Sequence, residues 1–234
     1  MRKKRIALAL LASLGISGAA QAALIDNGGG LIYDSALNIT WLQDGSYAKT
    51  TNYVSPVGPS RPPGQLGWVE AKTWAETLDY HGITGWRLPT FSTPFTDPAY
   101  YALYNVTSPA SELSYLFYVE LGNVGLFDPA GRQSNGGYGL VHTGPFKNLV
   151  AGDYWFGTPF LGGSTFSAWE FNMAFGYQQG ADPTLPFNAI AVHPGDVTLT
   201  PAAVPLPGTV WLLGSGVLSL LGATRRKRAM PDRI

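Results

Sequence analysis

The sequence predicts a single α+β domain between two short terminal segments. Three observations support this fold class. Residues 23–200, the body of the chain, contain no long linker and no internal repeat, and roughly 180 residues can bury a sizeable single core. Strand patterns occur at both ends of the body, and two helical patterns lie between them. Because strands and helices do not alternate as βαβ units, we expect α+β rather than a parallel sheet.

The first half of the body predicts two short strands, a loop and a helix. Residues 31–34 and 39–42 have strand patterns around a turn. Residues 53–65 are rich in Pro, Gly and Ser and predict a surface loop. Residues 68–80 predict a helix that stops near Gly82. Its apolar stripe is Trp68, Ala71, Ala75 and Leu78, and its other faces carry Glu70, Lys72, Glu76 and Asp79.

A second helix is expected next, followed by strands. Ser108-Pro109 supplies an N-cap and a first helical residue, and Gly122 ends the pattern. The apolar stripe of this helix is Leu113, Leu116, Phe117 and Leu121. Residues 127–145 are Gly-rich and predict a loop. The remaining strand-like stretches are residues 154–158, 165–177 and 187–193.

Residues 1–22 predict a secretory signal peptide. Arg2 to Arg5 form the charged region, and Ile6 to Ile16 form an apolar run that is too short to span a bilayer. Ala20 and Ala22 provide the small-x-small cleavage site, so we expect cleavage after Ala22 by signal peptidase, after passage through the Sec translocon. An N-terminal membrane anchor is the alternative, which the short apolar run and the cleavage site disfavour.

Residues 201–234 predict a second targeting segment, at the C-terminus. A proline pair precedes the uncharged residues 209–223, and a basic tail follows at 225–228. A helix of 15 residues is about 22 Å long, short of the ~30 Å hydrocarbon core, and the basic tail is expected to stay in the cytoplasm. A plain single-pass tail anchor is the alternative to a sorting signal. The residues of the expected signal are Val204, Pro205, Leu206, Pro207, Arg225, Arg226, Lys227 and Arg228.

The stretch VPLPGTVWLLGSGVLSLLGATRRKR resembles the PEP-CTERM sorting signal of Gram-negative bacteria. In that family exosortase, a membrane protease-transpeptidase, processes the protein near Pro-x-Pro, and the signal is associated with exopolysaccharide production. Leu206 stands where the family name implies Glu. The resemblance implies export across the inner membrane, a transient hydrophobic helix at residues 209–223, and then a cell-surface or secreted location. It also implies an exosortase-type enzyme as partner.

The body carries a second resemblance. GWRLPT (Gly85 to Thr90) follows a WxxAxxWAxxL helix, which in turn follows LIYDSALNITWLQDGSYA. SELSYLFYVELGN, DYWFGT, SAWEFNMAFGYQ and AIAVHPGDV come later in the chain. In this order, over about residues 30–197, these segments resemble the DUF1566 domain, also called the C-terminal domain of the Legionella collagen-like adhesin. The resemblance implies a C-type-lectin-like or formylglycine-generating-enzyme-like fold. His193 stands where an Arg is expected in the closing strand.

Composition excludes several function classes. Residues 23–207 carry six Lys or Arg against 14 Asp or Glu, a net charge of −8, while the other basic residues lie at the two ends. Nucleic acid is therefore not expected as a partner, because a phosphate backbone needs a clustered basic surface. The chain has no Cys, which excludes disulfides, thiolate metal sites and Cys nucleophiles. The cysteine-based oxidation of formylglycine-generating enzymes is excluded with them.

Trp86, Arg87, Leu88 and Pro89 form the most recognisable motif of the body. In one interpretation Arg87 clamps an anionic ligand. In the other, which we favour, Trp86 is buried, Arg87 pairs with an internal carboxylate and Pro89 turns the chain, since a lone Arg between Trp and Pro is typical of packing.

Glu170 and Asn172 are the only calcium candidates. On a strand they would share a face, and C-type lectins place oxygen ligands for calcium on a similar late strand after a Trp. Calcium needs six to eight oxygens, so a polar strand face opposite Trp169 and Phe171 is the favoured interpretation. The three histidines are too far apart in sequence to predict a zinc site. We therefore expect no metal and no cofactor.

Aromatic residues are the candidates for stacking on sugar rings. Seven could do so, and we single out Tyr100, Tyr101 and Tyr104 in the loop after GWRLPT as the expected ligand contacts. The other four are Tyr47, Tyr53, Trp155 and Tyr177.

Three function classes remain open. The prediction is a non-catalytic surface or matrix protein that binds glycan or adheres, because no catalytic motif such as G-x-S-x-G is assembled. The alternatives are a carboxylate-based hydrolase of extracellular polysaccharide and a purely structural matrix protein. If a glycan binds, the acidic body predicts a neutral or basic one rather than a sulfated one.

Overall fold

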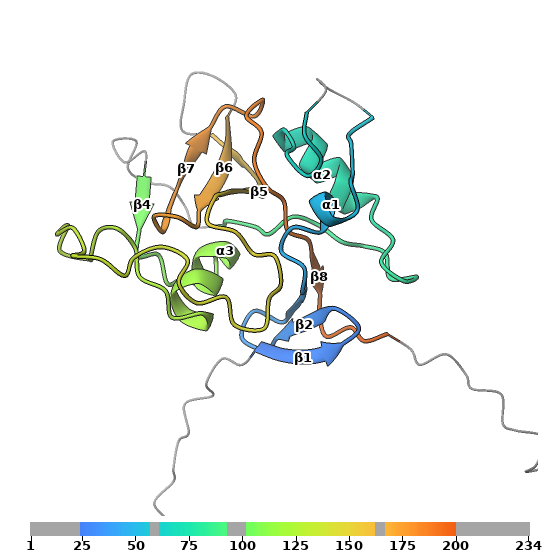
Figure 1. The fold of residues 1–234 in the computed structure, drawn as a ribbon, viewed down its shortest axis with the longest axis horizontal. Coiled ribbons are helices and arrows are strands. Elements are labelled where there is room, and N and C mark those ends of the chain that lie inside the picture. Colours follow the sequence, from blue (N-terminus) through green and yellow to red (C-terminus); the bar gives the residue numbers. More distant parts are fainter. Residues whose placement is uncertain (1–23, 57–60, 93–101, 162–166, 200–234) are drawn as a thin grey trace, which may run out of the picture. The chain divides into compact units, whose positions relative to one another are not determined.

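The computed structural model describes residues 24–56, 61–92, 102–161 and 167–199, which belong to one compact unit (Figure 1). The expected signal peptide, the expected sorting signal with its hydrophobic helix, and two of the expected ligand contacts, Tyr100 and Tyr101, lie outside the described residues. Within the described part of the chain, no helix combines the length and the apolar character needed to cross a membrane.

One antiparallel sheet joins the two ends of the body. Its strand order is β1 (Leu24–Gly28), β2 (Leu31–Asp34), β3 (Ile39–Leu42) and β8 (Val192–Pro194). The pairing of Trp41 with Val192 brings the last strand against one of the first. Both faces of β3 are buried, which explains its nearly continuous apolar sequence.

The second antiparallel sheet has the order β4-β7-β6-β5. Its strands are β4 (Ala102–Tyr104), β7 (Tyr177–Ala181), β6 (Ser167–Asn172) and β5 (Asp153–Phe160). This order places β4 beside β7, although more than 70 residues separate them in the sequence.

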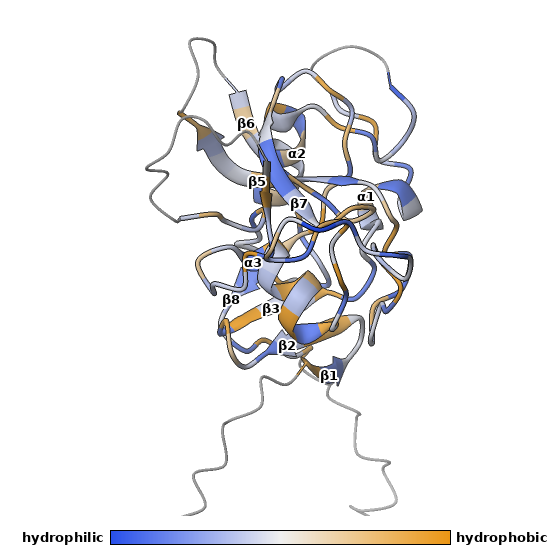
Figure 2. Cartoon of the chain, turned by 90° about the vertical axis from the view of Figure 1, so that its left-hand side faces the viewer, coloured by the Kyte–Doolittle hydropathy of each residue, from blue (hydrophilic) through white to orange (hydrophobic). Residues whose placement is uncertain are grey.

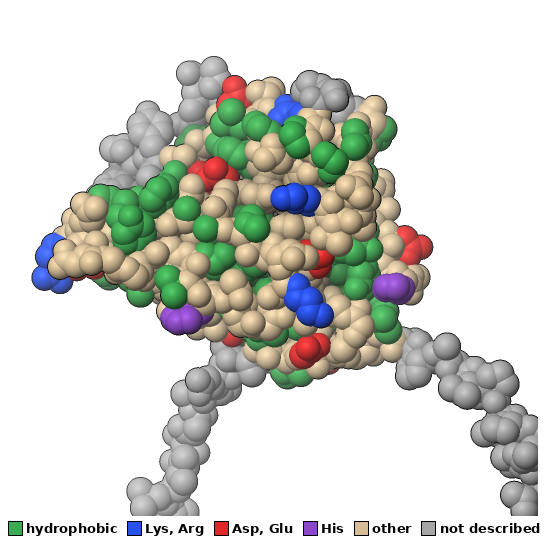
Figure 3. All heavy atoms as spheres, in the orientation of Figure 1, with side chains coloured by type: hydrophobic (Ala, Val, Ile, Leu, Met, Phe, Trp, Pro, Cys, Tyr) green, Lys and Arg blue, Asp and Glu red, His purple; other side chains and the backbone are tan. Residues whose placement is uncertain are grey.

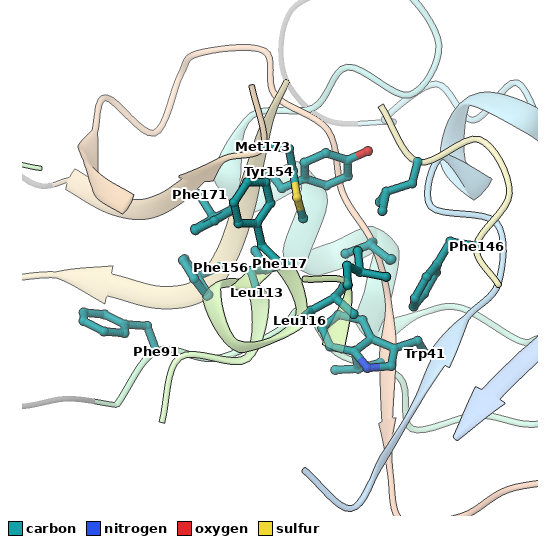
Figure 4. Close-up of a cluster of buried hydrophobic side chains, with 14 of the residues drawn as sticks. Trp41, Phe91, Leu113, Leu116, Phe117, Phe146, Tyr154, Phe156, Phe171 and Met173 are labelled. Carbon is teal, nitrogen blue, oxygen red and sulfur yellow. The ribbon is translucent and has the colours of Figure 1, made fainter. Parts of the chain in front are cut away.

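The helices are short. They are α1 (Tyr47–Thr50), α2 (Trp68–Glu76), and α3 (Glu112–Tyr115), which continues directly as the π-helix η1 (Leu116–Glu120). The apolar stripe expected at Leu113, Leu116 and Phe117 is fully buried. Figure 4 shows this stripe packed between Trp41 of β3 and the aromatic side chains of β5 and β6, and Figure 2 shows the hydrophobic colouring of β3 and of the neighbouring helix. A second cluster packs α2 against β5 around Trp68, Trp74 and Trp155.

The predicted α+β class is confirmed, with two antiparallel sheets and few helices in the described residues. The strands expected at 31–34 and 39–42 are β2 and β3, and residues 127–145 contain no helix or strand. Both helices begin or end differently from the prediction, for local reasons.

The first helix ends at Glu76 rather than near Gly82. The four residues 80–83 instead form a tight turn in which Tyr80 and Ile83 exchange backbone hydrogen bonds of 2.9 and 3.0 Å. His81 and Gly82 both have positive φ, which a helix does not allow. Glu70 was expected on an outer face of this helix but is buried. Its side chain folds back to the start of the helix, where Oε2 accepts a hydrogen bond of 2.7 Å from the Gly67 amide.

The second helix begins at Glu112, so Ser108-Pro109 does not start it. The Ser108 hydroxyl accepts a hydrogen bond from the Ala110 amide (3.2 Å), and its carbonyl accepts one from the Ser111 amide (3.0 Å). A serine side chain that binds nearby backbone favours a turn over a helix.

Residues 165–177 are not one strand. β6 ends at Asn172, and β7 begins at Tyr177 after a turn. The Asn172 side-chain oxygen accepts a hydrogen bond from the Phe175 amide (2.9 Å), and Gly176 has a φ of +76°. The stretch 187–193 is strand only from Val192 onward. β1, β4 and α1 were not expected.

Candidate functional site

The GWRLP motif connects strand β8 with helix α3 through hydrogen bonds and an ion pair of Arg87. Trp86 is 2% exposed, and Arg87 exchanges backbone hydrogen bonds of 2.9 Å with Val192 of β8. The Arg87 guanidinium makes a bidentate ion pair with Glu112 of α3 at 2.8 and 2.7 Å. Glu112 is the internal carboxylate that the structural interpretation expects. With both terminal nitrogens engaged, Arg87 is not available as a clamp for an anionic ligand.

The β4-β7-β6-β5 sheet presents two cross-strand rows on one face. Residues directly opposite each other on antiparallel strands project to the same face. The first row is Tyr104, Tyr177, Asn172 and Asp153. The second row is Gln179, Glu170 and Trp155. Glu170 and Asn172 thus share a face, while Trp169 and Phe171 belong to the hydrophobic core behind them.

Glu170, in the second row, is a buried acid next to Asp153 and Gln179. It is 0% exposed, and within the described residues neither carboxylate oxygen makes a hydrogen bond of good geometry, although the Gln179 and Asp153 side chains lie close enough to affect its pKa. Burial, and secondarily the nearby charge of Asp153, raise the pKa of Glu170 to about 9. Glu170 is therefore protonated at neutral pH.

This pair does not fit a calcium site. Calcium needs six to eight oxygen ligands, and the Glu170 carboxylate is 0% exposed, so it does not present its oxygens to an ion from solution. The Asn172 amide is already used, because its Nδ2 donates to Asp153 Oδ1 at 2.5 Å and its Oδ1 accepts from the Phe175 amide. Among the residues that the structure describes, no three His, Asp or Glu side chains gather to hold a metal ion.

A pocket of about 500 Å³ opens at the end of β4. The rings of Tyr104 and Phe127 meet edge to face in its wall, with centroids 5.3 Å apart. The Asn105 side chain donates a hydrogen bond of 2.9 Å to the Phe127 carbonyl and so ties the two walls together. The volume is within the range of small-ligand sites. The lining residues are Leu103, Tyr104, Asn105, Phe127, Asp128, Pro129 and Gly131.

The pocket has almost no net charge. Asp128 is the one acidic residue among those that line the pocket. Arg132 neutralises it, because its Nε and one terminal guanidinium nitrogen each lie 2.8 Å from Asp128 Oδ2. The Arg132 amide also donates to Asp128, and these contacts lower the pKa of the Asp128 carboxyl. The pocket therefore suits a neutral ligand.

Three more rings continue from this pocket. We call the chain of rings Phe127, Tyr104, Tyr177, Phe175 and Tyr138 the aromatic row. Successive centroids lie 5.3, 5.4, 6.3 and 6.2 Å apart. All five side chains are partly or well exposed, Phe175 most clearly at 38%. Figure 3, in the orientation of Figure 1, shows hydrophobic side chains gathered on the left of the molecule, over β4.

Hydrogen bonds from η1 and from the following loop hold the turn between β6 and β7 in place. Tyr118 of η1 donates a hydrogen bond to the Gly176 carbonyl, and the Leu126 amide donates one of 2.8 Å to the Phe175 carbonyl. A Cβ at Gly176 would lie 2.8 Å from the Gly125 Cα, so only glycine fits this contact. The rings of Phe175 and Tyr177 therefore project from a fixed backbone.

Of the expected ligand contacts, Tyr104 lies in the pocket and in the aromatic row. Tyr177 joins it, whereas Trp155 is fully buried and cannot stack on a ligand. Sequence reasoning missed Phe127, Phe175 and Tyr138, which lie in loops and a turn. One sequence feature could have identified them as ligand contacts. Each is an aromatic residue in a Gly-rich or turn segment, where no adjacent strand or helix covers the ring.

No protein family model matches the chain, and no curated protein or solved structure matches it either.

Proposed function

We propose that the protein is an exported surface or exopolysaccharide-matrix protein whose domain binds a neutral polysaccharide without catalysing a reaction. The observation that carries the proposal is the pocket at the end of β4, with its partly exposed Tyr104 and Phe127 rings and its neutralised acid. Aromatic rings offer sugars an apolar face, and a tyrosine adds a hydroxyl that can exchange hydrogen bonds with them.

Charge favours a neutral ligand over a sulfated one. The body has a net charge of −8, which repels polyanions, although at physiological salt the repulsion fades beyond a screening length of ~8 Å. Most of its basic residues also have an acidic partner within 4.0 Å. These pairs are Arg61–Glu70, Lys72–Glu76, Arg87–Glu112 and Arg132–Asp128.

Replacing Tyr104 by alanine is expected to weaken polysaccharide binding by roughly tenfold, since one wall of the pocket is lost; tenfold corresponds to about 1.4 kcal/mol. The measurement is affinity electrophoresis or calorimetry of the exported protein with neutral glucans, mannans and galactans. Tyr33→Ala is the matched control, because Tyr33 is a partly exposed tyrosine on β2 in the other sheet. Equal affinity of the parent and Tyr104→Ala would show that the pocket is not the site, as a purely structural matrix protein predicts.

The export part of the proposal rests on the terminal residues. The charged region, the apolar run and the Ala20-Gln21-Ala22 site support cleavage after Ala22, and VPLPGTVWLLGSGVLSLLGATRRKR supports sorting by an exosortase-type enzyme. The mature protein is expected to begin at Ala23, which intact-mass spectrometry of the exported form measures. A mature protein that retains residues 1–21 would contradict this.

We further propose a C-type-lectin-like architecture of the DUF1566 kind. The ordered segments from LIYDSALNITWLQDGSYA to AIAVHPGDV support it. So does the arrangement of two antiparallel sheets, in which the last strand, β8, pairs with β3 near the start of the chain and the helices lie between these two strands in sequence.

A carboxylate-based hydrolase is the second candidate. Asp153 and Glu170 share a sheet face, and glycosidases pair a protonated acid with an ionised carboxylate. Glu170, however, is 0% exposed, so a substrate oxygen does not reach it. Release of reducing ends from a bound neutral polysaccharide, abolished by Glu170→Gln, would favour the hydrolase over the binding module.

A further inference from the structure

We infer that the aromatic row is a platform for internal segments of a linear neutral polysaccharide. The protein then binds sugar units within the polysaccharide and not its terminal sugar. The inference rests on the proposed function and adds a class of ligand and a mode of binding to it. The row reaches from the pocket at the end of β4, across β7 and its turn, to the loop that carries Tyr138.

The succession of rings supports a long ligand. The planes of Tyr177 and Phe175 are parallel within 6°, and those of Phe175 and Tyr138 within 27°. Tyr104, in contrast, is inclined by 57° to Tyr177 and by 86° to Phe127, so the row offers ring contacts at successive positions but in more than one orientation. A linear polysaccharide presents similar ring faces at regular intervals, so each aromatic side chain can contact a different sugar unit.

The platform is fixed before the ligand arrives. Tyr118 binds the carbonyl of Gly176, between Phe175 and Tyr177, and the Phe175 carbonyl accepts the Leu126 amide. The loop with Tyr138 is fastened at its next residue, because the Gly139 amide donates a hydrogen bond of 2.8 Å to the Val124 carbonyl. A preformed surface loses little conformational entropy on binding, which suits a ligand that contributes only weak contacts per unit.

Recognition of a chain end requires a different site. A terminal sugar is usually held by several convergent polar or charged groups, or by a metal ion, in a closed pocket. Of the five side chains in the row none is charged, and the one lining acid, Asp128, is neutralised by Arg132. Stacking along an open row reads the repeating faces of a chain instead.

The test is a ladder of defined oligosaccharides, from mono- to hexasaccharide, cut from whichever neutral glucan, mannan or galactan the full exported protein binds. Calorimetry is expected to show affinity that rises with each added unit and then levels off. The monosaccharide should not compete with the polymer, and reduction of the chain end should not change polymer affinity.

Phe175→Ala separates the platform from the pocket. It should weaken hexasaccharide binding by roughly tenfold, a change of about 1.4 kcal/mol, and leave disaccharide binding unchanged, because the short ligand fills only the Tyr104 pocket. Phe175→Tyr keeps a ring at that position and should bind like the parent, and Tyr33→Ala is the control on the other sheet. Circular dichroism verifies that each variant is folded.

The outcomes distinguish the two proposals. If no neutral polysaccharide binds, the proposed function itself fails. If polysaccharide binds but affinity is independent of length, the monosaccharide competes, or Phe175→Ala acts equally on short and long ligands, the platform is overturned while the glycan-binding function stands. Capture of a protein and not of a polysaccharide overturns both.

Discussion

Replacing Glu112 by alanine is expected to lower the free energy of unfolding by about 3 kcal/mol. The Glu112 side chain is 10% exposed and makes both contacts with the Arg87 guanidinium, while its Oε2 also accepts the Thr90 amide at 2.6 Å. Removal leaves a partly buried cation without its counter-ion, held only by the 3.0 Å hydrogen bond to the Leu88 carbonyl, and leaves the Thr90 amide without this acceptor. We expect the lower end of the range for buried pairs because 31% of the Arg87 side chain reaches solvent.

Urea unfolding at neutral pH measures this effect. Glu112→Gln should cost less than Glu112→Ala, because the amide oxygen can still accept the Thr90 hydrogen bond. Glu76→Ala is a matched control on α2, where a 61% exposed glutamate lies 4.0 Å from Lys72. An exposed pair of this kind contributes at most about 0.5 kcal/mol. Similar losses for Glu112→Ala and Glu76→Ala would show that the GWRLP motif does not depend on this ion pair.

The fold was predicted correctly where buried side chains recur at the regular spacing of a helix or strand along the sequence. The stripe of Leu113, Leu116 and Phe117 follows a helical repeat, and its residues are all buried. Short edge strands give no such period: β4 has three residues, and β1 alternates weakly. Helix ends were misplaced where a side chain competes with the helix for backbone groups, as Ser108 does.

The candidate site was only partly predictable because it is assembled by nonlocal pairing. Tyr104 could be chosen from its loop sequence, but its neighbours depend on the β4–β7 register, which sets Tyr104 opposite Tyr177. The closeness of Phe127 depends on a loop that returns to the end of β4. Nothing in the sequence near Tyr104 specifies either contact.

The burial of Glu170 shows another limit of sequence patterns. Alternation correctly places Glu170 and Asn172 on one face of β6, opposite Trp169 and Phe171. An alternating strand is normally solvated on its polar face, but here Glu170 is 0% exposed and Asn172 is 7% exposed. Whether a polar face is covered depends on what packs over it, and that is a tertiary property.

Replacing Glu170 by glutamine is therefore expected to stabilise the protein at neutral and alkaline pH. The pKa of Glu170 is raised to about 9 from an ordinary value of 4.5, so the folded chain keeps a proton that the unfolded chain releases. Below pH 4.5 both states are protonated, and the stability contribution of Glu170 is fully present. Between the two values the unfolded state binds fewer protons, and stability falls with rising pH by up to about 1.4 kcal/mol per unit.

Glutamine has no proton to lose, so the difference between Glu170→Gln and the parent should grow from near zero at about pH 4 to about 2–3 kcal/mol at neutral pH. Urea unfolding of both proteins across this range measures it. The comparison isolates Glu170 from Glu120, because burial raises the pKa of Glu120 to about 7 in both proteins. Asp153→Asn is the second control: it removes the charge that acts on Glu170 and should make the pH dependence shallower. A variant that is less stable than the parent at pH 8 would mean that Glu170 is ionised and stabilising in the fold, and the calcium interpretation of Glu170 and Asn172 would then regain support.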